Sequence, residues 1–132
     1  MSRISPPVRK KLASIAEVIA REKGPLHFFA VVQRSAVADR WDILVSAKKL
    51  KPWSIEAIRY IADLLQKRLS VGEIVQVARI VPLPRDNALV EDLSNSPSWP
   101  RGTYSGVHPL DEPTDFEVIW PMQRTKRQTQ SA

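Results

Sequence analysis

Residues 26–46, LHFFAVVQRSAVADRWDILVS, contain two apolar runs that are separated by a short polar segment. In the first run, residues 26–34, apolar side chains occupy both alternating faces. This pattern is typical of a central strand that is covered on both sides. The second run covers residues 41–46. Because the segment between the runs is short, we expect the two strands to form an antiparallel hairpin.

Two amphipathic helices are expected on either side of this hairpin in the sequence. Residues 5–23 repeat apolar side chains at spacings of three and four, and Ser5 followed by Pro6 is a suitable helix start. Residues 54–69 show the same periodicity, with Ser54 as the N-cap. The sequence therefore predicts two helices, each with one buried face.

The remaining elements are shorter. Residues 73–81 are rich in β-branched side chains and predict a strand that ends at Pro82. Residues 87–93 predict a short helix capped by Asp86, and residues 116–120 predict a final strand. The expected fold class is α+β: a small, mostly antiparallel four-stranded sheet packed with two main helices, in the order α-β-β-α-β-(α)-β. The helical connection allows the second and third strands to be parallel.

Length and composition predict one domain. The chain has 132 residues, of which 43% are hydrophobic, so it can bury a core without disulfides. We expect a single α+β domain at residues 1–120, with a long Pro-rich loop at 94–115, and a basic, disordered tail at 121–132.

The absence of cysteine excludes disulfides, thiolate metal sites and cysteine nucleophiles. No apolar run approaches the roughly 20 residues that a membrane span requires. These features predict a cytoplasmic protein that does not contact a membrane.

The net charge of +6 is unevenly distributed. Residues 1–23 carry six basic and two acidic side chains, and residues 121–132 carry three basic side chains and no acidic one. Residues 94–120, in contrast, carry one basic and four acidic side chains. Basic ends suit an acidic partner, which would be a nucleic acid or an acidic protein surface, and they are also common in solvated termini.

Sequence motifs for catalysis or cofactor binding are missing. Neither a phosphate-binding glycine loop nor an HExxH motif is present. The two histidines, His27 and His108, are far apart in sequence, and no third metal ligand accompanies them. We therefore expect no metal and no cofactor, and we interpret His27 as a hydrogen-bonded core or edge residue.

Two groups of residues leave an enzymatic hypothesis open. Asp39 and Asp42 could hold Mg²⁺ or share acid and base roles. The simpler interpretation is that Asp39 is a turn residue and Asp42 lies on the polar face of a strand. The loop segment RGTYSGVH combines an anion-binding arginine with a proton-transferring histidine and two glycines. This loop segment, with Arg101 and His108, would form the active site of a small hydrolase or transferase.

The segment WDILVSAKKLKPWSIEAIRY, residues 41–60, interleaves aromatic and basic residues, as nucleic-acid-binding surfaces do. Trp41, however, lies on the strand face that is expected to pack against a helix. Counting from the Ser54 cap places Trp53 and Ile58 at the two positions of a hydrophobic staple. Lys48, Lys49 and Lys51 lie in the turn between the second strand and the second helix, which we call the lysine turn. On this interpretation, these lysines, without the tryptophans, are the part of the segment that meets a partner.

The favoured hypothesis is a non-catalytic binding or regulatory module that contacts another macromolecule, most simply a protein, or a second copy of itself. One alternative is sequence-unspecific nucleic-acid binding through the first helix, the lysine turn and the tail residues Arg124, Lys126 and Arg127. The other is the enzyme described above. The candidate partner-binding residues are Lys48, Lys49, Lys51, Arg59, Trp99, Arg101, Tyr104 and His108.

Overall fold

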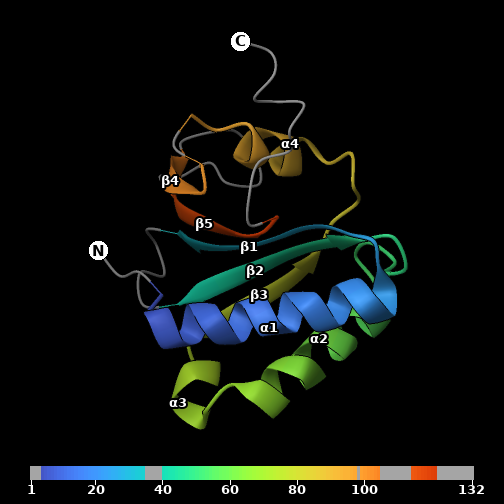
Figure 1. Ribbon diagram of the computed structural model, residues 1–132, viewed down its shortest axis with the longest axis vertical. Coiled ribbons are helices and arrows are strands. Elements are labelled where there is room, and N and C mark those ends of the chain that lie inside the picture. Colours follow the sequence, from blue (N-terminus) through green and yellow to red (C-terminus); the bar gives the residue numbers. More distant parts are fainter. Residues whose placement is uncertain (1–3, 35–39, 98, 105–113, 122–132) are drawn as a thin grey trace.

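The computed structural model describes residues 4–34, 40–97, 99–104 and 114–121. In these ranges, five strands form one mixed sheet with helices on both faces (Figure 1). The elements are α1 (Pro6–Lys23), β1 (Leu26–Arg34), β2 (Trp41–Ala47), α2 (Ile55–Arg68), α3 (Val71–Ile74), β3 (Val77–Pro82), α4 (Ala88–Ser94), β4 (Arg101–Tyr104) and β5 (Thr114–Trp120).

The order of the strands across the sheet is β3-β2-β1-β5-β4. The expected antiparallel hairpin of β1 and β2 is confirmed. β2 and β3, which are connected through α2 and α3, are parallel, whereas β5 is antiparallel to both β1 and β4. The α+β class is thus confirmed, but the prediction of four strands is wrong in detail. The fifth strand, β4, lies inside the segment that was expected to be a loop.

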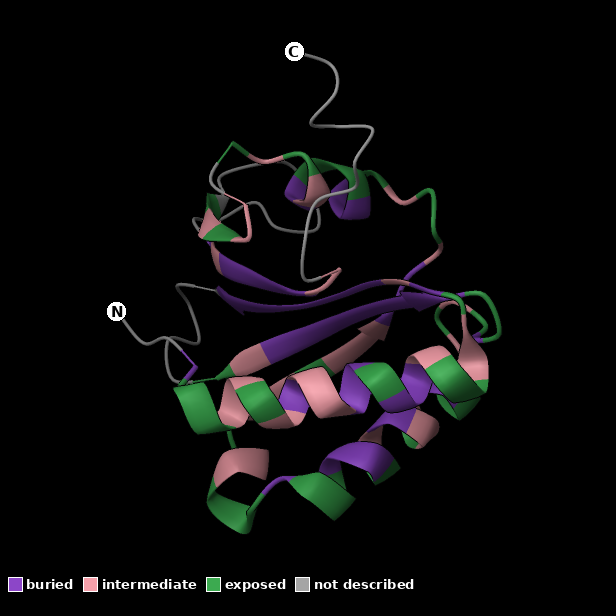
Figure 2. Ribbon diagram, viewed as in Figure 1, coloured by how far each residue is buried: buried purple, intermediate pink, exposed green. Residues whose placement is uncertain are grey.

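β1 is the central strand, and its two faces belong to two separate cores. Phe29 and Val31 face the core between the sheet and the helices α1 and α2. Phe28, Ala30 and Val32 face the second core, which α4 covers. Figure 2 shows most of β1 as buried between these layers. The alternation of apolar side chains in residues 26–34 therefore predicted the burial of both faces correctly.

The predicted starts of the two long helices are confirmed. The Ser5 hydroxyl accepts a hydrogen bond from the Val8 amide at 3.4 Å, and the Ser54 hydroxyl accepts one from the Ala57 amide at 3.1 Å. These bonds satisfy amide groups that have no partner within the first helical turn. The start of α4 differs from the prediction, because Asn87 is its cap and not Asp86.

The third strand begins later than predicted. Residues 73–76 precede β3 and belong to the short helix α3 and its C-terminal end. Ser70 and Glu73 form a reciprocal capping box at the start of α3, and this local pattern prevails over the β-branched composition. Glu73 also accepts a hydrogen bond from Lys11 of α1 at 2.8 Å, and this bond lowers the pKa of the Glu73 carboxyl group.

Within the described ranges, none of the helices is both long and apolar enough to cross a membrane.

Candidate functional site

The turn that follows β2 lies against the C-terminal end of α1, at one end of the sheet (Figure 1). The amide of Lys48 donates a hydrogen bond to the carbonyl of Pro25 at 3.0 Å, and the amide of Lys49 donates one to the carbonyl of Lys23 at 2.9 Å. These bonds fix the turn next to Lys23, which is distant from it in sequence.

An open groove of ≈ 390 Å³ runs between this turn, the end of α1 and the start of α2. Leu50 and Ala57 are buried and supply apolar surface to the groove, while polar and charged side chains supply the rest. We call it the lysine groove. It is lined by Lys23, Lys49, Leu50, Lys51, Ser54, Glu56, Ala57 and Tyr60.

Tyr60 and Lys23 are in contact with each other in the groove. The ammonium group of Lys23 lies 5.1 Å from the centroid of the Tyr60 ring, within the range of a cation–π interaction. The Tyr60 hydroxyl donates a hydrogen bond to Glu22 Oε1 at 2.5 Å. Burial and the Glu22 carboxylate raise the pKa of Tyr60, so its phenol stays protonated at neutral pH. Tyr60 therefore contributes a neutral ring and not an anion.

The lysine groove carries an excess of positive charge. Three of its lining residues are lysines and one, Glu56, is acidic. In the part of the chain that the structure describes, none of the ion pairs involves Lys23, Lys49 or Lys51. Their ammonium groups are thus available to an acidic ligand, apart from the contact of Lys23 with Tyr60.

Two further cations lie near the start of β1. His27, at the start of β1, is half-buried and is affected by the charges of Lys48 and Arg85. Burial lowers the pKa of His27, and the two cations lower it further. Positive charge therefore extends from the groove around the end of the sheet.

The lowered pKa of His27 predicts a pH dependence of stability. In the unfolded chain, His27 has the ordinary histidine pKa of 6.5, whereas the pKa of His27 in the folded chain is lower. The unfolded state then binds more protons in this window, so the free energy of unfolding falls as the pH drops from 6.5 toward the folded pKa. Urea denaturation across this window should show the loss, and His27→Gln should abolish most of it. An unchanged pH dependence in His27→Gln would contradict this assignment.

The expected hydrophobic staple is wrong. Trp53 is 60% exposed and has a φ of 62°, in the left-handed region that a tryptophan rarely adopts, so its side chain is not packed as a staple requires. Its amide donates a hydrogen bond to the carbonyl of Pro82 at 2.9 Å. Trp41, in contrast, packs against the core under α1 and α2 as expected. One of the two tryptophans is therefore on the surface beside the lysines.

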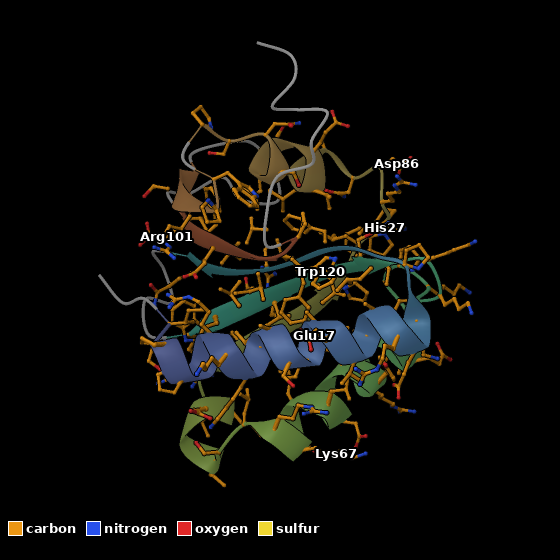
Figure 3. All side chains as sticks on the ribbon, viewed as in Figure 1. Glu17, His27, Lys67, Asp86, Arg101 and Trp120 are labelled. Atoms are coloured by element: carbon orange, nitrogen blue, oxygen red, sulfur yellow. The ribbon has the colours of Figure 1, made fainter. Side chains whose placement is uncertain are left out.

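The predicted partner-binding residues do not form a single site. Arg59 is exposed on α2 but does not line the lysine groove, and Trp99 packs against the core on the α4 side. Arg101 lies at the opposite end of the sheet from His27 (Figure 3). The side chain of Tyr104 lies outside the described residues, as do His108 and Asp39.

Arg101 has an intramolecular partner. Its guanidinium lies 3.6 Å from the buried carboxylate of Glu117, which also accepts hydrogen bonds from Arg9 of α1. Glu117 thus connects α1, β5 and β4 through two arginines, and its hydrogen bond raises the pKa of Arg9. This network gives Arg101 a structural role that a loop assignment does not suggest.

The Asp42 carboxylate forms a structural ion pair with Arg79. Its side chain is 1% exposed and accepts a hydrogen bond from Arg79 of β3 at 2.7 Å. Asp42 lies on the α4 face of the sheet with Leu44, whereas Arg101 shares the α1 face with Glu117, and two strands separate them. The structure therefore does not bring these two candidate enzymatic residues together. Across the described ranges, no group of three or more His, Asp or Glu side chains is arranged to hold a metal ion.

Three residues of this end of the sheet were missed from the sequence: Lys23, Tyr60 and Arg85. Lys23 ends a helix, where a cation is favoured by the helix dipole, so its position alone indicates no site. The hydrogen bonds between residues 23–25 and 48–49, which join segments distant in sequence, lie between Lys23 and the turn.

No protein-family model, curated protein or solved structure matches this chain.

Proposed function

We propose that the protein is a non-catalytic binding module that contacts an acidic segment of another protein through the lysine groove. The observation that carries this proposal is the convergence of Lys23, Lys49 and Lys51 on one open groove without an ion-pair partner among the described residues. Cations of one sign in a concave surface attract acidic ligands and increase their rate of association.

The lining favours a protein segment over a nucleic-acid backbone. Leu50, Ala57 and Tyr60 line the groove together with the three lysines, which suits a segment that combines acidic and apolar residues. Glu56 lies in the same lining and would repel a continuous row of phosphates.

The double variant Lys49→Gln/Lys51→Gln should weaken binding of a fluorescein-labelled peptide rich in glutamate and leucine by about 5- to 30-fold, because each exposed ion pair contributes roughly 0.5–1 kcal/mol. Fluorescence polarisation measures this change. Lys10→Gln/Lys67→Gln, which removes the same charge from exposed positions outside the groove, is the matched control and should bind like the wild type. Equal weakening in both variants would show that only net charge matters and would overturn the site.

Nucleic-acid binding is a second candidate, and the exposure of Trp53 beside Lys51 favours it. An exposed ring next to cations can stack on a base while the lysines contact phosphates. A single-stranded oligonucleotide with the same charge as the peptide separates the two functions. Binding that is tighter than that of the peptide, depends steeply on salt and is lost in Trp53→Ala would establish this second function in place of the first.

A further inference from the structure

Exposed apolar side chains gather at the two ends of β3. Among the described residues, the large hydrophobic side chains with the greatest exposure are Trp53 (60%), Ile55 (57%), Val71 (82%) and Val75 (61%). Val71 and Val75 lie in and just after α3, directly before β3 begins. Trp53 is hydrogen-bonded to Pro82, the last residue of β3, and Ile55 starts α2 beside it. The lysine groove includes none of these four side chains.

β3 is an edge strand of the sheet. It pairs with β2 on one side, and no other strand in the described ranges pairs with its outer side. Most of its side chains are half-buried, and its charged residue, Arg79, is held by Asp42 at 2.7 Å. A strand of this kind presents backbone amides and carbonyls that another strand can pair with.

We propose that two copies of this chain associate by antiparallel pairing of their β3 edges, which joins the two sheets into one. The two-fold axis of such a dimer places the start of one β3 beside the end of the other. Val71 and Val75 of one copy then lie next to Trp53 and Ile55 of the second copy, and the same contact is repeated on the other side of the axis. The exposed apolar residues at both ends of β3 thereby contact the same partner molecule.

The distribution of charge favours the antiparallel arrangement. Parallel pairing would place the turns with Lys48, Lys49 and Lys51 of the two copies side by side, which like charges oppose. Antiparallel pairing places each turn next to residues 70–76 of the other copy, where Glu73 is the single formal charge and is paired with Lys11. Antiparallel pairing with a second copy therefore brings the exposed apolar surfaces together and avoids the like-charge repulsion of the parallel arrangement.

Sedimentation velocity over a range of protein concentrations tests this dimer. The wild type should show a reversible monomer–dimer equilibrium. Trp53→Glu and Val75→Lys, both at exposed positions, should each raise the dissociation constant by about a hundred-fold, because each removes two symmetric apolar contacts. Glu91→Lys, at an exposed position on α4, is the control and should leave the equilibrium unchanged.

Mixing the two variants provides the decisive measurement. In an antiparallel dimer, Trp53→Glu of one copy faces Val75→Lys of the other, and the second contact keeps its native residues. The mixture should therefore dimerise more tightly than either variant alone. A wild type that stays monomeric at every concentration would overturn the proposal and leave the edge to a different partner. A dimer that neither variant weakens, or a mixture without recovery, would also overturn it.

Discussion

Gly24→Ala is expected to lower the free energy of unfolding by about 2–4 kcal/mol, because a new side chain in a closed space forces the backbone to move. A Cβ atom at Gly24 would lie 2.0 Å from the carbonyl oxygen of Ala20 and 2.9 Å from its carbon. Both neighbours are backbone atoms of α1, so a rotamer change cannot relieve the clash. Urea denaturation of the wild type and the variant measures the loss.

Gly72→Ala is the matched control for this prediction. Apart from its chain neighbours and the backbone of its own helix, no atom lies within 4 Å of a Cβ at Gly72, in α3, and alanine favours a helix over glycine by up to about 1 kcal/mol. The control should therefore be neutral or slightly stabilising. A similar loss of stability in both variants would show that the close approach at Gly24 is not the cause.

The position of Gly24 also connects stability with the lysine groove. Gly24 lies between Lys23 and Pro25, whose carbonyls accept the hydrogen bonds from the amides of Lys49 and Lys48. A displacement of the backbone here moves the turn relative to the end of α1. We therefore expect Gly24→Ala to weaken peptide binding even under conditions in which the variant is still folded.

The sequence predicted the central part of the fold because local pattern and burial agree there. The apolar side chains of residues 26–34 alternate, and the two faces of β1 lie in the two cores. Ser5 and Ser54 begin helices as expected, since a cap depends on residues only three positions away.

The errors arose where contacts between distant residues decide the structure. β4, Arg101–Tyr104, has no strand periodicity, and its pairing with β5 defines it as a strand. Trp53 fits a staple by its spacing, yet its side chain is 60% exposed, its φ is positive and its amide is hydrogen-bonded to the carbonyl of Pro82. A count along the helix cannot reveal either constraint.

In the candidate site, too, local sequence patterns indicated some residues, whereas others depend on contacts between distant parts of the chain. The sequence indicated the lysine turn, because three cations in a short segment lack acidic neighbours. It could not indicate Lys23 or Tyr60, since their contribution depends on packing of α1 and α2 against the turn. The sequence indicates Arg101 as an anion-binding residue of a Pro-rich segment, whereas in the structure its guanidinium lies beside the carboxylate of Glu117.

Arg79→Ala is the second substitution with a large expected effect, a loss of about 2–4 kcal/mol, because it removes the Arg79 guanidinium from the buried carboxylate of Asp42. Asp42 and Arg79 are register partners on the parallel strands β2 and β3, and their side chains are 1% and 49% exposed. The hydrogen bond to Asp42 raises the pKa of Arg79, so the folded state favours the charged guanidinium.

A double-mutant cycle separates the ion pair from other effects of truncating Arg79. Asp42→Asn removes the negative charge but retains a similar shape, so Arg79→Ala/Asp42→Asn should be less destabilised than the sum of the two single variants. Lys67→Ala is the exposed comparison: its ion pair with Asp63, 3.0 Å long, is 68% and 60% exposed and should contribute less than about 0.5 kcal/mol. Urea denaturation of the variants measures all these differences. Strict additivity in the cycle would mean that Arg79 stabilises the sheet through packing of its aliphatic part, and not through the charge of Asp42.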